Sequence, residues 1–192
     1  MTTAAPSRSL SLVALFAALL AVFGLIPKID LPFGVPITIQ TLGVMLAGCL
    51  LAPRQAFQAL SLFMVAVALG LPLLSGGRGG LGVFVAPSGG FLVGMLFSAV
   101  ATSWVMRMLP GEGPRRLALR AFVAAVIGGI GVEYAFGIAG LVVLAKLSVW
   151  QATVASLAFV PGDLIKCVLC AMVVHTVARS VPDWRFGSRT AT

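Results

Sequence analysis

The sequence predicts an all-α integral membrane protein with six transmembrane helices, forming one domain over residues 1–192. Hydrophobic residues make up 60% of the chain and charged residues 9%, whereas soluble domains average about 45–50% and 25%. Apolar runs of about 20 residues, the length that crosses a bilayer, recur along the chain. These runs are continuous rather than alternating, which argues against a β-barrel.

Proline, glycine and charged residues separate the predicted spans. The first follows Arg8 and exceeds the signal-peptide apolar core of about 7–15 residues, so we interpret it as a retained helix that stops at Pro27. The second is short and ends at Pro53. The third ends at Pro72, before a glycine-rich loop at residues 75–82. The six expected spans cover about 9–26, 37–52, 56–71, 88–109, 117–145 and 161–180.

The second half of the chain has equally clear boundaries. Ser88, directly before an apolar run, is typical of a helix N-cap and opens the fourth span. The loop at residues 110–116 separates the fourth span from the fifth. Residues 146–160 are mixed in character, and we expect a short interfacial helix there, anchored by Trp150. Pro161, a favourable residue for a first helical turn, begins the sixth span.

Basic residues fall unevenly on the two sides that six spans create. On the side of the termini are nine: Arg8, Arg54, Arg107, Arg115, Arg116, Arg120, Arg179, Arg185 and Arg189. On the other side are three: Lys28, Arg78 and Lys146. The positive-inside rule therefore predicts that both termini are cytoplasmic. The same bias accounts for the net charge of +8 without nucleic-acid binding.

Two charged residues, Asp163 and Lys166, interrupt the apolar run of the sixth span. Charge within a membrane segment is expensive and marks functional sites. A spacing of three residues puts both side chains on one helix face. The two could neutralise each other, or they could bind a small polar molecule. Because the span enters from outside at Pro161, a pocket at this depth would open outward.

Other polar and small residues have both a structural and a functional interpretation. Arg78 in the glycine-rich loop serves solubility or holds an anionic group. The G-x-G-x-x-G match at residues 77–82 is weak, because no strand precedes it. Gly90 and Gly94 suit close helix packing or the approach of a ligand to exposed N–H groups. Ala14 and Ala18 suit packing within the chain or docking to another membrane subunit.

Pairs of adjacent polar residues occur in two further spans. Gln40 and Thr41 begin the second span on its outer side, and Glu133 and Tyr134 lie within the fifth. For Glu133 a functional role and a structural one are both open. The sequence contains no Walker A motif and no plausible catalytic triad. We expect no catalytic residue, metal site or cofactor, and we interpret the cysteines as apolar packing residues.

Three motifs, in order along the chain, resemble those of the BioY family, the biotin-specific substrate-binding (S) components of energy-coupling-factor (ECF) transporters. Residues 35–41 (VPITIQT) resemble V-P-[IV]-T-x-Q-[TN], residues 86–94 (APSGGFLVG) resemble G-P-T-G-G-[YF]-L-x-G, and residues 159–166 (FVPGDLIK) contain P-G-D-x-x-K. The chain departs from the family pattern at Ser88 and at Glu133, where the family is more apolar.

The resemblance implies a six-helix S-component fold in the bacterial cytoplasmic membrane, with cytoplasmic termini and biotin as substrate. It implies that Ala14 and Ala18 contact a transmembrane coupling subunit, which works with two ATPase subunits. Biotin offers two ureido N–H donors, a carbonyl and a carboxylate; either Lys166 or Arg78 could bind the carboxylate. The substrate-binding residues expected on this basis are Asp163, Lys166, Arg78, Gln40, Ser88, Gly89, Gly90 and Phe91.

Two alternatives remain beside biotin uptake. The chain could be an S component for a different vitamin. It could also be an intramembrane enzyme that uses Asp163 and Glu133 as acid and base.

Overall fold

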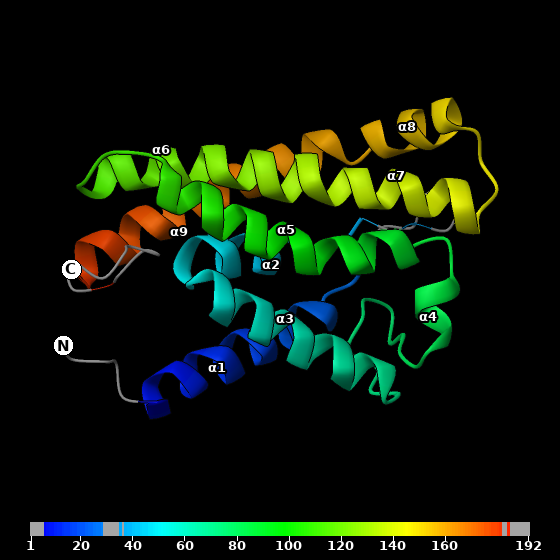
Figure 1. The fold of residues 1–192 in the computed structure, drawn as a ribbon, viewed down its shortest axis with the longest axis horizontal. Coiled ribbons are helices and arrows are strands. Elements are labelled where there is room, and N and C mark those ends of the chain that lie inside the picture. Colours follow the sequence, from blue (N-terminus) through cyan, green and yellow to red (C-terminus); the bar gives the residue numbers. More distant parts are fainter. Residues whose placement is uncertain (1–5, 29–34, 36, 182–183, 185–192) are drawn as a thin grey trace.

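The chain folds into an elongated bundle of helices (Figure 1). The computed structural model describes residues 6–28, 35, 37–181 and 184. The described residues form no β-strand, and an isolated bridge joins Leu74 to Arg78, which agrees with the predicted all-α class. The helices are α1 (Pro6–Gly24), α2 (Gln40–Leu50), α3 (Pro53–Ala68), α4 (Gly82–Val85), α5 (Gly89–Met108), α6 (Pro114–Ala124), the π-helical η2 (Ala125–Val132), α7 (Glu133–Leu144), α8 (Val149–Leu157) and α9 (Val160–Ser180).

Proline sets several helix starts, with one correction to the predicted boundaries. α6 begins at Pro114 and α9 has Pro161 in its first turn. α3 begins at Pro53 rather than at residue 56, so the break expected at residues 53–55 is a turn of helix. Proline lacks the N–H that a first turn leaves unpaired, and the Gln55 side chain accepts a hydrogen bond from the Ala52 N–H at 3.2 Å.

Three helical stretches in the described residues are long and apolar enough to cross a membrane. They are Gly89–Met108, Pro114–Leu144 and Val160–Ser180, with 20, 31 and 21 residues, and they match the fourth, fifth and sixth predicted spans. The first three predicted spans correspond to helices of 19, 11 and 16 residues. The count of six spans therefore stays a prediction.

The shortness of α2 has a structural explanation. A helix of this length measures about 16 Å, roughly half the hydrocarbon thickness of a bilayer. Nearly all of its residues are buried, and it packs against α1, α3, α5, α9 and η2. Protein rather than lipid therefore surrounds α2, so its length need not match the membrane.

Glycine allows α5 and α7 to approach closely. A Cβ added at Gly90 would lie 2.5 Å from the carbonyl oxygen of Phe136, and one at Gly94 would lie 3.0 Å from that of Glu133. Neither position has room for a larger side chain without moving the backbone. Of the two interpretations of the glycine pair, helix packing is the one these contacts support.

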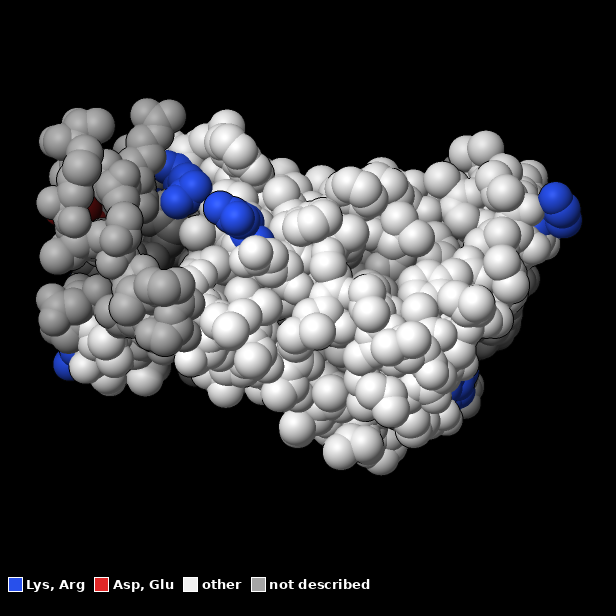
Figure 2. Space-filling model, turned by 60° about the horizontal axis from the view of Figure 1, so that its bottom comes forward, with Lys and Arg blue, Asp and Glu red and all other residues white. Residues whose placement is uncertain are grey.

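The two ends of the bundle carry different segments. The described termini and the α5–α6 loop lie at one end, and the segments before α5 and after α7 lie at the other (Figure 1). Figure 2 shows Lys and Arg near both ends of one face, with a broad uncharged band between them. Three of the basic residues used in the charge argument lie wholly or partly outside the described part: Arg185, Arg189 and the side chain of Arg8.

Candidate functional site

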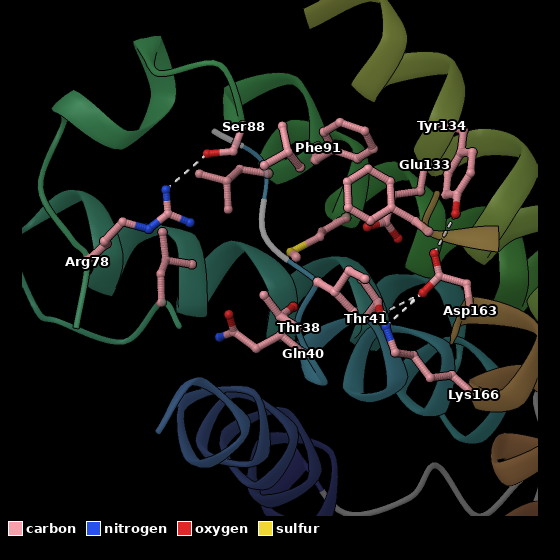
Figure 3. A pocket seen from close by; sticks show the side chains of 16 residues that line it. Thr38, Gln40, Thr41, Arg78, Ser88, Phe91, Glu133, Tyr134, Asp163 and Lys166 are labelled. Atoms are coloured by element: carbon pink, nitrogen blue, oxygen red, sulfur yellow. Dashed lines mark hydrogen bonds and ion pairs between the residues drawn. The ribbon is translucent and has the colours of Figure 1, made fainter. Parts of the chain in front are cut away.

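A pocket opens among the N-terminal parts of α2, α5 and α9, with α7 forming another wall. Its empty space is about 550 Å³, a volume that includes open solvent at the mouth. Its lining combines apolar and aromatic side chains with polar groups at two ends (Figure 3). The lining residues are Val35, Ile37, Thr38, Gln40, Thr41, Leu74, Arg78, Ser88, Phe91, Leu92, Met95, Glu133, Tyr134, Phe159, Asp163 and Lys166.

Asp163 and Lys166 form an ion pair at the first polar end. Lys166 Nζ lies 2.7 Å from Asp163 Oδ1 and donates a second hydrogen bond to Thr41 Oγ1 at 2.8 Å. Tyr134 donates to Asp163 Oδ2 at 2.6 Å. Both charged residues are buried, and they pair with each other on one face of α9, as the helical spacing of three residues predicts. The hydrogen bonds of the pair connect α9 to α2 and α7. The two charges neutralise each other, and they also line the pocket, so this geometry is compatible with both alternatives from the sequence.

Three aromatic rings stand beside this polar group. Phe91 contacts Tyr134 and Phe159 edge-to-face, with ring centroids 6.2 and 5.8 Å apart. The Tyr134 and Phe159 rings are 6.5 Å apart. Edge-to-face contacts of this kind fix ring orientation. The rings therefore give the pocket a firm apolar wall next to its charged group.

Arg78 and Ser88 form the second polar end, across the pocket from Asp163 (Figure 3). Arg78 donates to the Ser88 hydroxyl at 3.2 Å and to the Ser75 carbonyl at 3.4 Å. Both acceptors are neutral. Ser88 stands at the N-cap position of α5 as predicted, yet its side chain makes no capping hydrogen bond. Its hydroxyl is used by Arg78 instead.

The loop that carries Arg78 has a defined backbone. Leu74 and Arg78 exchange two backbone hydrogen bonds at 3.0 and 3.2 Å, and Gly80 N–H donates to the Val67 carbonyl at 2.7 Å. Gly76 and Gly77 adopt φ values of 82° and 69°, which favour glycine. These two glycines therefore form a tight turn, and Arg78, which follows the turn, lines the pocket.

Gln40 lines the pocket but its amide is occupied within the protein. Nε2 donates to the carbonyls of Leu20 and Leu73 at 3.1 and 2.9 Å. Oε1 accepts from the Ser75 N–H and hydroxyl at 3.2 and 3.3 Å. These contacts join α1, α2 and the glycine-rich loop, so Gln40 holds the pocket together.

The remaining expected site residues divide between the pocket and its surroundings. Phe91 lines the pocket, whereas Gly89 and Gly90 are not among the lining residues. Ala14 and Ala18 lie outside the pocket, on the exposed face of α1. Six of the eight expected substrate-binding residues therefore line one cavity, five of them with polar side chains: Gln40, Arg78, Ser88, Asp163 and Lys166.

Several lining residues were not among the expected site residues. Tyr134 had a usable signal, because it is the chain's one tyrosine and follows an intramembrane glutamate. Thr41 lies within the first motif, and Phe159 lies two residues before the P-G-D-x-x-K motif. Leu92 lies within the second motif. Met95 gave no signal, because apolar residues in an apolar span look alike until their neighbours are known.

The sequence profile of the BioY family matches residues 1–183. The chain belongs to the BioY family. It is 47% identical to a protein named biotin transporter BioY from Rhizobium etli over 179 residues, covering 92% of this chain and 96% of that protein. It is 44% identical to a protein of the same name from Rhodobacter capsulatus, with the same coverage.

A solved structure extends this relationship to the fold. The structure, described as the S component for biotin from an ECF-type ABC transporter, matches with a TM-score of 0.82 and 26% sequence identity. The match covers 93% of this chain and 95% of that one. The relatives are named as biotin transporters rather than enzymes. The alternative of an intramembrane enzyme is therefore set aside, although the structure does bring Asp163 and Glu133 to one pocket.

Proposed function

We propose that this chain is the S component of an ECF transporter and captures biotin in the pocket between α2, α5, α7 and α9. One observation carries the proposal. In a member of the BioY family, the buried Asp163–Lys166 pair and the Arg78 guanidinium occupy opposite ends of one largely apolar cavity. Biotin has the matching order of groups: a polar ureido ring, an apolar thiophane ring and chain, and a terminal carboxylate.

The hydrogen bonds already present favour one orientation of biotin. Lys166 is engaged by Asp163 and Thr41, whereas Arg78 meets only neutral acceptors among the described residues. A guanidinium binds carboxylates through paired N–H groups. The valerate carboxylate is therefore assigned to Arg78 with Ser88, and the ureido ring to Asp163 and Lys166. Phe91 and Phe159 flank the apolar part.

We further propose that the chain is one domain with six spans in the bacterial cytoplasmic membrane and cytoplasmic termini. The basic residues of the described part support this orientation, since those on α6 and at the end of α9 lie at the end with the termini. The pocket then opens outward. The exposed pair Ala14 and Ala18 suits the coupling subunit, through which two ATPase subunits would energise release inside.

A binding titration tests the proposal. Purified protein in detergent is titrated with biotin, thiamine, riboflavin and folate, and bound ligand is extracted and identified by mass spectrometry. We expect saturable binding of biotin alone and recovery of unaltered biotin. Preferential binding of another vitamin would support the alternative S-component assignment, and recovery of a modified product would restore the enzyme hypothesis.

A further inference from the structure

Glu133 is a buried carboxyl group whose role the ion pair and the arginine do not explain. It is 2% exposed and lines the pocket. Its Oε2 atom makes no hydrogen bond to any described residue. Such an orphaned acceptor is costly in a poorly solvated site unless something else pairs with it. Figure 3 shows Glu133 at the end of the pocket that holds Tyr134 and Asp163, away from Arg78.

The chain conformation directs Glu133 toward this position. Glu133 directly follows η2, and its N–H donates to the carbonyls of Gly128 and Ile130. A π-helical turn holds more residues than an α-helical turn and so changes the direction of the side chains beyond it, and such turns are frequent at functional sites. Glycine makes the close packing possible: a Cβ at Gly128 would lie 2.7 Å from the backbone nitrogen of Thr102.

Asp163 has few hydrogen-bond acceptor sites left for a ligand. A carboxylate offers about four lone-pair sites, and Lys166, Thr41 and Tyr134 occupy three of those on Asp163. One site remains for a ligand. A cyclic urea presents two N–H groups that point to opposite sides of its ring. A single remaining site on Asp163 can satisfy one of them, so the other needs an acceptor elsewhere.

We propose that Glu133 accepts the second ureido N–H of the substrate and so acts as a further substrate-binding residue. This inference rests on the proposed function. The other polar atoms of the pocket fit the role less well, since Gln40 Oε1 accepts two hydrogen bonds from Ser75 and Ser88 Oγ accepts from Arg78. Thr38 also lines the pocket and is the natural control.

Binding of biotin and of two analogues, each methylated at one ureido nitrogen, tests the inference. Glu133→Ala removes the acceptor and leaves room for a methyl group. We expect it to weaken biotin binding by about 5- to 150-fold, the loss for one unpaired buried donor. We also expect it to bind one analogue as well as biotin, whereas the native protein discriminates against both. Glu133→Gln retains an acceptor oxygen and should stay within a few-fold of native affinity and keep the native preference.

The controls separate this inference from the proposed function. Thr38→Ala should keep the native preference for biotin over both analogues. Native affinity for biotin in Glu133→Ala, or loss of discrimination in Thr38→Ala instead, would overturn the role of Glu133 while biotin binding itself stands. A native protein that fails to bind biotin would overturn the proposed function, and the inference with it. Melting temperatures of the ligand-free variants establish that each is folded.

Discussion

Asp163 has three hydrogen-bond donors around it before any ligand arrives. Lys166, Thr41 and Tyr134 come from α9, α2 and α7 respectively, so the carboxylate is oriented by three separate helices. A preoriented polar group loses little entropy when it binds a ligand. The same contacts that neutralise the buried charge would therefore also orient it for the proposed binding of biotin.

Removing either charge of the pair should weaken biotin binding. Asp163→Asn and Lys166→Met each delete a charge-assisted hydrogen bond, which is worth about 1.5–3 kcal/mol, or roughly 10- to 150-fold in affinity. Isothermal titration measures the loss. Ile165→Ala changes an exposed neighbour on the same turn and should leave affinity unchanged. Native affinity in both charge variants would mean that the pair has only a structural role.

Arg78 should confer a preference for the free carboxylate. The native protein is expected to bind biotin more tightly than biotin amide, because the guanidinium attracts an anion. In Arg78→Gln this preference should disappear. Lys146→Gln removes a positive charge from the same end of the molecule and should keep the preference. If the native protein binds biotin and biotin amide with equal affinity, the proposed contact between Arg78 and the carboxylate is wrong.

At the scale of helices, α1 and α7 each display an exposed pair of alanines four residues apart. Ala14 and Ala18 lie on the exposed face of α1, and Ala135 and Ala139 on that of α7. Small residues at this spacing permit close helix contact. Only the α1 pair is assigned here to the coupling subunit, so the α7 pair is a matched control.

Larger side chains on the exposed face of α1 should reduce biotin uptake but not biotin binding. Ala14→Leu with Ala18→Leu would hold a partner helix away, because such interfaces depend on small residues. Biotin binding in detergent should persist, while uptake by cells with coupling and ATPase subunits should fall. Ala135→Leu with Ala139→Leu should leave uptake intact. If the α1 variant transports normally, this face is not the coupling surface; if it loses binding too, the face packs within the chain.

The α5–α7 contact predicts a clear difference between two glycines. Gly90→Ala places a methyl 2.5 Å from the Phe136 carbonyl oxygen, whereas Gly82 has no atom within 4 Å of an added Cβ. Overpacking of this kind costs about 1–3 kcal/mol. Thermal unfolding in detergent should show a lower melting temperature for Gly90→Ala and little change for Gly82→Ala. Equal melting temperatures would contradict the close helix contact.

For the whole molecule, the distribution of charge relates the bundle to the membrane. The uncharged band in Figure 2 separates the two ends that carry basic residues. The end with the described termini also carries the basic start of α6 and Arg179 near the end of α9. This asymmetry decides the proposed orientation, with the pocket opening outward.

Labelling of single cysteines tests the orientation. The native cysteines Cys49, Cys167 and Cys170 are buried, so the unmodified chain serves as a blank. A membrane-impermeant maleimide applied to intact cells should modify Leu81→Cys and spare Glu112→Cys until the cells are opened. Both positions are exposed. The reverse pattern would place the pocket on the cytoplasmic side.

The sequence by itself determined the class of the protein, several helix boundaries and the charged residues of the site. Composition limits the chain to a membrane environment, prolines end helices because they lack an N–H, and the spacing of Asp163 and Lys166 fixes their shared face. These features depend on residues close together in the chain, so they need no knowledge of the fold.

Tertiary structure decided which distant residues surround the pair. The contacts of Asp163 with Thr41 and Tyr134 join residues separated by 122 and 29 positions, and no local pattern encodes such distances. The same holds for Gln40, whose polar side chain looked suited to a ligand but binds backbone atoms of two other segments. For Glu133 the sequence left two equal interpretations, and the proposed binding role rests on the π-helical turn and the unpaired Oε2 atom, which only the structure shows. Hydrogen bonds are directional over about 3 Å, so only the assembled helices reveal which polar groups are satisfied and which remain free to bind.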